Sequence, residues 1–384
     1  MPSGGDSLPV TNQLKAPDAV CLIRLSAIGD CCHTLPVVRT LQAAWPRTRI
    51  TWIIGRTEFG LLEGASGIEF ITFDKRTPWA SLASIRRQLV GRRFPLLLHM
   101  HASMRANLVS SVVRADTRLG FDRNRARDYQ WLFTSEKIAP TPSQHVMDGL
   151  FSFAEHLGVR QRDLRWDFSL GADDRRRAGE LAGGTRPLVV ISPCSSQRFR
   201  NYRNWSIGNY TAVVRHLVGT RGARVVLTGG PTDLERGYGA AIQQALGGPA
   251  NGSVINLIGQ TRLKELFAII QAADLVICPD SGPAHMATAA RVPVVGLYAT
   301  SNRHRTGPYF SQRLVVDRYP EAVQQEFGKP VEALRWGERV RDPGAMDLIR
   351  VEDVIGRIDQ VLDGTLRPDG GPPPVAAPAS GAGN

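Results

Sequence analysis

The residues best suited to chemistry in this 384-residue chain lie in three short turns, each of which follows an apolar run. In one of them, Asp280-Ser281-Gly282-Pro283 separates the run "DLVIC" from a small-residue segment that contains His285. Pro283 suits the first position of a helix, and Ser281 or Gly282 suits its cap. The free N–H groups and the positive dipole end of such a helix predict a phosphate site. His285 is interpreted either as a ligand contact or as a structural histidine satisfied within the protein.

A second turn, "LSAIGDCCHTLP", carries a carboxylate and a histidine directly after a predicted strand. Because proline is tolerated in the first turn of a helix but not in its middle, Pro36 predicts a helix that begins near His33 or Thr34. Asp30 would then lie on the preceding loop, at the edge where the strand ends. It could accept a proton from a hydroxyl there, or it could cap the helix. The spacing leaves both interpretations open.

A third turn, "ISPCSSQRFRNYRNW", combines hydroxyl and guanidinium groups at the end of another predicted strand. Side chains such as Ser195 and Arg203 could hold a diphosphate through bidentate hydrogen bonds. The alternative is a surface loop decorated with arginines. The turn that carries Asp30 lacks the G-x-G-x-x-G fingerprint, which argues against a dinucleotide-dependent dehydrogenase.

The elements that must position these turns are short apolar strands that alternate with amphipathic helices. Such strands indicate parallel sheets covered on both faces. Ligands bind these sheets beyond the carboxyl ends of the strands, which is where all three turns fall. The strands are predicted at residues 19–25, 49–54, 69–73 and 95–100, and again at 187–192, 223–229, 253–259, 274–279 and 292–298.

The two series of strands predict an α/β protein with two doubly wound domains. The polar stretch between them is interpreted as a hinge, and the Pro-, Ala- and Gly-rich residues after Gly364 are expected to be disordered. The predicted segments are a flexible N-terminus (1–18), a first domain (19–170), the hinge (171–186), a second domain (187–345), a terminal helix (346–364) and the disordered tail (365–384).

The net charge of +12 is uneven along the chain. Residues 75–127 contain twelve lysines and arginines against two aspartates. A surface of this kind attracts phosphate groups on nucleic acid, on an anionic membrane or on a phosphorylated substrate. The chain has no helix-turn-helix, zinc or RNA-recognition signature, and the few aromatic residues of the basic segment do not alternate with its arginines in a regular pattern. Nucleic acid is therefore not expected as a partner.

The sequence also bears on the compartment. No apolar run approaches the roughly 20 residues needed to span a bilayer, and the N-terminal residues lack the pattern of a signal peptide. We therefore expect the protein in the cytoplasm. The five cysteines are odd in number and show no C-x-x-C spacing. They are expected to be reduced and mostly buried rather than bound to a metal or to one another.

Together the turns resemble the motifs of glycosyltransferase family 9, the ADP-heptose:lipopolysaccharide heptosyltransferases. The stretch "LIRLSAIGDCCHTLPVVRTL" is similar to the opening motif of that family, and "DLVICPDSGPAHMATAARVPVVGLYATS" is similar to its C-terminal motif. A looser likeness is "GGPTDLE", which contains Glu235 and resembles a family loop near the nucleotide. The resemblance covers most of residues 19–310.

The resemblance implies a GT-B architecture, in which two Rossmann-like domains face each other across a cleft. The first domain would bind mainly the acceptor and the second mainly the sugar nucleotide. The transfer would be inverting, with Asp30 as the general base and with no metal ion or other cofactor. The residues implied on the donor side are Ser195, Arg203, Glu235, Asp280, Ser281, Gly282 and His285, and those on the acceptor side are Gly29, His33, Arg76 and Arg123.

One of these positions departs from the family pattern. Arg203 stands where the family usually has a lysine that is thought to hold the phosphates. A guanidinium is a planar fork and an ammonium a point charge, so the two are not equivalent. Arg203 can still supply a positive charge to the phosphates, and the identity of the sugar-nucleotide donor is left open.

The function that the resemblance implies is transfer of a heptose from ADP-heptose to a lipopolysaccharide inner-core acceptor of the lipid A–Kdo type. One alternative is a transferase of the same family with another sugar nucleotide or another glycan acceptor. A further alternative is a non-catalytic sugar-binding protein on the same scaffold. A phosphorylated glycolipid acceptor and the basic segment 75–127 together imply peripheral binding to the anionic inner face of the bacterial inner membrane.

Overall fold

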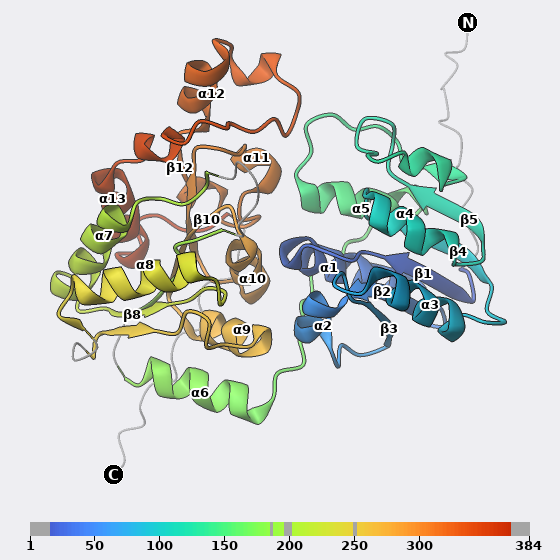
Figure 1. Cartoon of the computed structure of the whole chain (residues 1–384), viewed down its shortest axis with the longest axis horizontal. Coiled ribbons are helices and arrows are strands. Elements are labelled where there is room, and N and C mark those ends of the chain that lie inside the picture. The colour runs from blue at the N-terminus through green and yellow to red at the C-terminus, as the bar shows by residue number, and fades with distance from the viewer. Residues whose placement is uncertain (1–15, 185–186, 196–201, 249–251, 370–384) are drawn as a thin grey trace, which may run out of the picture.

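Two parallel sheets organise the protein (Figure 1). The computed structural model describes residues 16–184, 187–195, 202–248 and 252–369. The first sheet has the order β3-β2-β1-β4-β5-β6 and the second the order β12-β11-β10-β7-β8-β9. Their strands are β1 Ala19–Ile23, β2 Arg49–Gly55, β3 Ile68–Phe73, β4 Phe94–His99, β5 Ala115–Gly120 and β6 Glu136–Lys137, then β7 Leu188–Ile191, β8 Arg224–Leu227, β9 Val254–Asn256, β10 Leu275–Pro279, β11 Val294–Tyr298 and β12 Val316–Asp317.

Helices connect successive strands, as parallel pairing requires. The helices of the first half are α1 Ile28–Ala44, α2 Arg56–Leu62, α3 Pro78–Gln88, α4 Met104–Ser111 and α5 Val146–His156. Those of the second half are α6 Ala172–Ala182, α7 Ile207–Gly219, α8 Asp233–Gln244, α9 Leu263–Ala272, α10 Gly282–Ala290, α11 Arg303–Thr306, α12 Tyr319–Phe327 and α13 Val351–Leu362. The predicted α/β architecture with two doubly wound parallel sheets is confirmed.

Apolar strand sequences explain why the central strands lie where they do. Every residue of β1 and of β10 is buried, because helices cover both faces of each sheet. One cluster of buried apolar side chains includes residues of both halves, among them Leu35 of α1 and Met286 of α10. The five cysteines are free and buried, as predicted.

The start of α1 differs from its predicted position. The helix begins at Ile28, so Asp30 lies in its first turn and Pro36 lies in its interior. Proline within a helix leaves the carbonyl four residues earlier without its donor. That carbonyl belongs to Cys32, and the indole Nε1–H of Trp166 donates to it at 2.8 Å. The contact comes from a distant part of the chain, which is why the proline alone was misleading.

The stretch predicted as a hinge, 171–186, is largely helical, because it contains α6. The Asp174 carboxylate accepts the N–H of Gly171 at 3.0 Å and so satisfies the start of the helix. Arg176 pairs with Glu180 one turn later at 2.8 Å. The helix packs against α9, where Arg177 pairs with Glu265 at 2.7 Å.

Both chain ends were predicted to be flexible. Residues 1–15 and 370–384 lie outside the described part of the chain. Residues 365–369 fell within the predicted disordered tail, but they are placed against the second half. The N–H of Asp369 donates to Phe310 O at 2.6 Å, and its carboxylate pairs with Arg313 at 3.1 Å. The predicted terminal helix is α13, which begins five residues later than expected, at Val351 rather than residue 346.

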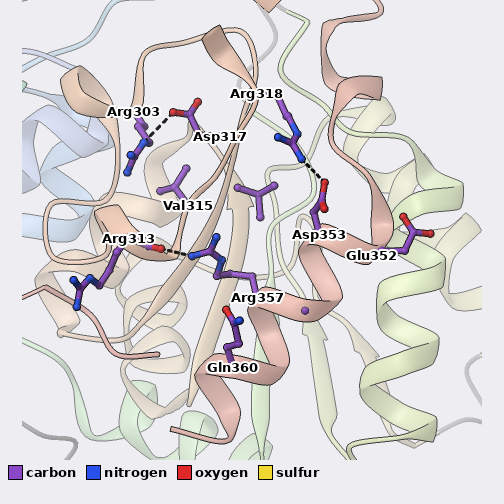
Figure 2. Close-up of a pocket in the computed structure, with 11 residues that line it drawn as sticks. Arg303, Arg313, Val315, Asp317, Arg318, Glu352, Asp353, Arg357 and Gln360 are labelled. Carbon is purple, nitrogen blue, oxygen red and sulfur yellow. Dashed lines mark hydrogen bonds and ion pairs between the residues drawn. The ribbon is translucent and has the colours of Figure 1, made fainter. Parts of the chain in front are cut away.

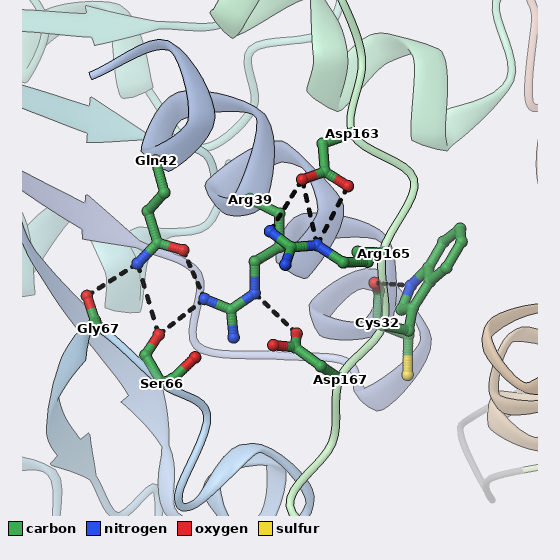
Figure 3. Close-up of polar contacts among 9 residues, drawn as sticks. Cys32, Arg39, Gln42, Ser66, Gly67, Asp163, Arg165 and Asp167 are labelled. Atoms are coloured by element: carbon green, nitrogen blue, oxygen red, sulfur yellow. Dashed lines mark hydrogen bonds and ion pairs between the residues drawn. The ribbon is translucent and has the colours of Figure 1, made fainter. Parts of the chain in front are cut away.

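The connection from α5 to α6 crosses the surface of α1 (Figure 3). Asp163 N–H donates to the Thr40 hydroxyl at 2.8 Å, and Arg39 Nε donates to Asp167 at 2.7 Å. Arg39 also donates to Ser66 O at 2.7 Å, so one guanidinium links three segments. On the other side of the same connection, the guanidinium of Arg291 in the second half lies 5.3 Å from the centre of a Trp166 ring.

Removing the Arg39 guanidinium should destabilise the first half. The side chain is only 2% exposed, so Arg39→Met loses charged hydrogen bonds that water cannot replace. We expect the free energy of unfolding, measured in urea, to fall by about 2–4 kcal/mol. The matched control is Arg165→Met, whose side chain is 61% exposed and pairs with Asp163. It should change stability by less than about 0.5 kcal/mol. Equal losses in both variants would show that the buried guanidinium stabilises the protein no more than an exposed one.

Candidate active site

Two helix N-termini face each other where the halves meet. α1 follows β1 and α10 follows β10, and each of these strands lies at the point where the strand order of its sheet reverses. Ligands bind doubly wound sheets at this point. The two helices are in contact, and Figure 1 shows them between the two sheets. The turns that carry Asp30 and Asp280 therefore lie on either side of the contact between α1 and α10, which we call the seam.

Gly29 makes this close approach possible. A Cβ at this position would lie 2.1 Å from Cδ2 and 2.9 Å from Cγ of His285, which no real contact allows. The glycine was predicted as an acceptor-side residue, and the structure gives it a packing reason as well. At Gly282 the situation differs, because a Cβ there would meet Ile28 at an ordinary 3.8 Å.

His285 belongs to a buried group of three histidines. Its Nδ1 lies 2.9 Å from Nε2 of His33, so a hydrogen bond joins α10 to α1. The ring of His145, at the start of α5, lies 5.6 Å from that of His33. His145 accepts the N–H of Met147 on Nδ1 and lies 2.9 Å from Gly307 O through Nε2, which assigns its proton to Nε2.

These histidines are uncharged at neutral pH. Burial lowers the pKa of His33 well below its usual value and lowers that of His285 as well. Burial lowers the pKa of His145 to about 4. A neutral pair can share one proton in the bond between His33 and His285, whereas two protonated rings would repel each other. The sequence left His285 open between a structural and a ligand-binding role, and its bond to His33 supplies the structural partner.

Asp30 combines the two roles that its position left open. Its Oδ2 accepts the N–H of Ala27 at 3.3 Å, as a helix-capping carboxylate does, and it also pairs with the guanidinium of Arg24. The side chain remains 31% exposed. Burial favours a raised pKa for Asp30, but the charge of Arg24 and the hydrogen bonds outweigh it and hold the pKa below its usual value. The carboxylate is therefore ionised at neutral pH and open to a ligand.

Asp280 has a different environment. It is buried, and Nη1 of Arg203 donates to its carboxylate at 2.9 Å and to its main-chain carbonyl at 2.7 Å. Arg339 lies 4.0 Å from the same carboxylate. Burial favours a raised pKa for Asp280, but the charges of these two arginines outweigh it and lower the pKa. Asp280 thus fixes Arg203 beside the first turn of α10.

The start of α10 has no side-chain cap. The hydroxyl of Ser281 donates to Pro279 O at 3.1 Å instead of accepting an N–H from the helix. The positive end of the helix dipole therefore has no anionic or hydroxyl cap from this residue. With Arg203 and Arg339 nearby, this turn can hold an anion.

Sequence reasoning missed several charged groups of this site. Arg305, from α11, makes no side-chain hydrogen bond or ion pair with the described residues, and burial lowers its pKa. It is within electrostatic reach of both Asp30 and Asp280. The signal for Arg305 was the basic stretch "SNRHRTGPY", whereas nothing near Arg339 in the sequence pointed to the site.

His101, two residues after the end of β4, was also missed. Its Nδ1 accepts the N–H of Leu25 at 3.1 Å, so a neutral ring must carry its proton on Nε2. Burial lowers the pKa of His101 to about 3, and the ring is within electrostatic reach of Arg24 and Asp30. His101 is therefore a hydrogen-bond donor with a fixed tautomer beside Asp30.

Other predicted residues lie apart from this group or are engaged elsewhere. Ser195 is buried, and its N–H donates to Asn204 at 2.9 Å. Glu235 accepts the N–H of Gly230 and the hydroxyl of Thr232, which caps α8. Residues 196–201 of the predicted phosphate loop lie outside the described part of the chain.

On the acceptor side, Arg76 is exposed and pairs with Asp74 at 2.8 Å. Arg123 is exposed in the loop after β5. The structure does not bring these two arginines together with Asp30 by any bond between described residues. Both nevertheless follow strands of the first sheet at the edge where Asp30 lies.

Two surface cavities lie away from the seam. One of about 520 Å³ lies between β12 and α13, where Arg303 pairs with Asp317 and Arg318 with Asp353 (Figure 2). Another of about 660 Å³ lies between the ends of α1 and α5. No predicted site residue lines either cavity. Their linings contain ion pairs and loop residues that the candidate chemistry does not use.

Two properties of the described residues bear on metals and membranes. No three His, Cys, Asp or Glu side chains in this part of the chain are grouped to hold a metal ion. No helix in the same residues is both long and apolar enough to cross a bilayer.

Comparison with known proteins gives consistent results. The model of "Glycosyltransferase family 9 (heptosyltransferase)" matches residues 82–336. The chain is 38% identical over 347 residues to the lipopolysaccharide core heptosyltransferase OpsX of Haemophilus influenzae, covering 90% of this chain and 98% of that protein.

Solved structures show the same fold. The family 9 glycosyl transferase of Veillonella parvula has a TM-score of 0.72 at 21% identity, with 90% of this chain and 97% of that chain covered. The E. coli heptosyltransferase WaaC with ADP has a TM-score of 0.67 at 16% identity, with 89% and 99% covered. These likenesses confirm the GT-B architecture.

A double-mutant cycle tests the fit between Gly29 and His285. Gly29→Ala should lower the free energy of unfolding by about 1–3 kcal/mol, because the new methyl group overlaps the imidazole. In a His285→Ala background the space is free and alanine has the higher helix propensity, so the same change should be neutral or slightly stabilising. Urea unfolding of the four proteins measures the coupling. Additive effects would show that the two residues do not pack together in solution.

Proposed function

The chain belongs to glycosyltransferase family 9, and we propose that it transfers a heptose from ADP-heptose to a lipopolysaccharide inner-core acceptor of the lipid A–Kdo type. The relative that shares 38% of its residues carries the name of a lipopolysaccharide core heptosyltransferase. The observation that carries the proposal is the placement of an ionised, partly exposed Asp30 opposite the uncapped start of α10. Asp30 can remove a proton from the acceptor, and the start of α10 can hold the diphosphate of the donor.

The donor binds with its diphosphate at the first turn of α10. Arg203 and Arg339 lie beside that turn, and Arg305 adds a further positive charge from α11. As the bond from the sugar to ADP breaks, negative charge grows on the diphosphate, and these fixed positive groups stabilise it. Because protein groups supply this charge, the proposed transfer needs no metal ion and no other cofactor.

The acceptor hydroxyl attacks the anomeric carbon from the side opposite ADP, which inverts the configuration of the transferred sugar. Asp30 accepts the hydroxyl proton as the new C–O bond forms. Arg24 keeps Asp30 ionised before the acceptor arrives, and His101 offers its Nε2–H as a donor on the same side. ADP leaves with the electron pair of the broken bond.

The first half binds the acceptor in this proposal. Its segment 75–127 is strongly basic, with Arg76 and Arg123 exposed at the edge near Asp30. A phosphorylated glycolipid in an anionic leaflet complements that charge. The enzyme accordingly works in the cytoplasm at the inner face of the inner membrane.

A second candidate function keeps the same chemistry with another donor. Arg203 replaces the usual lysine, and its Nη1 already donates to both the carboxylate and the carbonyl of Asp280. This changes how the phosphates are contacted and could admit a different nucleotide or sugar.

The proposed function is tested by supplying each donor with a Kdo–lipid A acceptor. With ADP-heptose we expect mass spectrometry to show an acceptor heavier by one heptose, and NMR to show an inverted anomeric configuration. The yield should not change in EDTA. Transfer from a UDP- or GDP-sugar instead would support the second candidate, and loss of activity in EDTA would contradict the metal-independent step.

Asp30→Asn should lower kcat by about 10²–10⁴-fold, because the amide keeps the shape of the side chain but cannot take the proton. Since the pKa of Asp30 lies below its usual value, wild-type kcat/KM should not decline through this group until the pH falls below the range in which an ordinary aspartate titrates. Asp116→Asn, on β5, is the matched control and should keep wild-type rates. A wild-type rate in Asp30→Asn would remove Asp30 from the base role.

A further inference from the structure

Five large apolar side chains are exposed on one part of the first half. They come from α4 and from the 3₁₀ turn Gln130–Leu132 with the residue before it, and their exposed fractions lie between 39% and 63%. We call them the α4 patch: Met104, Leu108, Tyr129, Trp131 and Leu132. Single exposed apolar residues are common, but a group of this size marks an interaction surface.

The residues beneath the patch hold it in place. The Asp128 carboxylate accepts the N–H of Met104 at 2.9 Å, and the Asn107 side chain donates to Asp128 O. Gln130 Nε2 donates to His99 O at 2.8 Å, and His99 in turn bonds to Asn107 at 3.0 Å. His99, Asn107 and Gln130 are fully buried, so a polar network ties the loop to α4 and β4.

Two successive residues at the patch have a strained backbone. Asp128 and Tyr129 have φ values of 51° and 61°, in the left-handed region that residues other than glycine rarely adopt. Two such residues in succession cost free energy that the network beneath must offset. The result is that Tyr129, Trp131 and Leu132 point outwards instead of folding into the core.

Positive charge surrounds the patch. Arg105 is exposed on α4, and Arg123 and Arg127 are exposed in the loop that leads from β5 to the 3₁₀ turn. The nearby acids are already engaged, since Asp128 caps α4 and Asp122 is buried and paired with Arg125. Tryptophan and tyrosine beside arginines suit the boundary between lipid headgroups and acyl chains. An anionic bilayer complements both the charge and the apolar side chains.

The patch lies beside the acceptor side of the site. α4 begins three residues after His101, whose ring bonds to the main chain of Leu25 just before the turn of Asp30. Both α4 and the loop that follows β5 leave the sheet at the carboxyl ends of its strands, where Asp30 also lies. A surface seated on the patch therefore lies against the edge at which an acceptor hydroxyl must arrive.

We propose that the α4 patch inserts into the headgroup region of an anionic bilayer and so presents the site to a membrane-bound acceptor. The inference deepens the proposed function, because that function places the acceptor in a membrane. The apolar side chains supply the insertion, and the three arginines supply the preference for anionic lipid. A protein partner or a second copy of the chain would use the same apolar groups without needing lipid.

Vesicle flotation with the full chain tests the proposal. Wild-type protein should float with vesicles of phosphatidylcholine and phosphatidylglycerol, and poorly with phosphatidylcholine alone. The double variant Trp131→Ser/Leu132→Ser should bind the anionic vesicles at least about tenfold more weakly, from the loss of two inserted side chains. The variant Arg105→Glu/Arg127→Glu should also lose binding, and salt should weaken the binding of wild type.

Val90→Ser is the matched control. Val90 is 74% exposed, but it lies between the end of α3 and the start of β4, where the amino ends of the strands lie. The patch lies at the carboxyl ends, so the loss of Val90 should leave vesicle binding unchanged. Thermal unfolding checks that each variant is folded. Equal vesicle binding by wild type and the Trp131/Leu132 variant, or no binding by wild type, would overturn the proposal. A wild-type dimer that this variant loses would assign the patch to a protein interface instead.

The test is separate from that of the proposed function. Transfer to a delipidated, water-soluble core acceptor should be unchanged in the Trp131→Ser/Leu132→Ser variant, because neither residue belongs to the proposed site. A chain that floats through the patch but transfers no heptose would refute the proposed function and leave the membrane surface standing. A chain that transfers heptose but does not float with vesicles would refute the membrane surface and leave the proposed function standing.

Discussion

The packing of the first turn of α1 against the first turn of α10 is the contact on which the site depends. It requires the absence of a side chain at Gly29, because the ring of His285 occupies that space. The hydrogen bond between His285 and His33 then joins the two helices across the halves. Since each helix begins at the end of a central strand, this one contact fixes the relative position of the groups that lead out of both sheets.

Charge at the seam is arranged in two unequal pairs. Asp30 and Arg24 are partly open, so their pairing can be exchanged for contacts with a ligand. Asp280 and Arg203 are both buried, so their pairing is a fixed part of the protein. The neutral histidines between them add no charge of their own. Asp30 therefore remains accessible to a ligand, whereas Asp280 holds a cation in place.

Much of this could be predicted from the sequence. The apolar runs located the central strands, and both Asp30 and Asp280 follow the carboxyl ends of such strands, as predicted, where ligands bind sheets of this kind. β5 was missed because its sequence, "ADTRLG", lacks an apolar run. Asp174 and the Arg176–Glu180 spacing indicate a helix within 171–186, although the polar composition of this stretch is equally typical of a linker.

Other features depend on contacts between distant residues and were beyond local reasoning. The helix runs through Pro36 only because Trp166, 134 residues after Cys32, supplies the missing donor. Arg339 reaches Asp280 through the path of the chain after α12, which no motif describes. The role of Gly29 is visible only with His285 beside it. In each case the energy comes from the assembled fold and not from the segment.

The attachment of Trp166 has a consequence for movement. Its indole is bonded to the carbonyl of Cys32, near the start of α1, and the guanidinium of Arg291 from the other half lies beside its ring. A connecting segment held on both sides is not a loose tether. Separating the halves there would break the contact between Arg291 and Trp166, or else pull Trp166 away from the helix that carries Asp30. A motion that opens the molecule must therefore either pivot about these contacts or break them, close to Asp30.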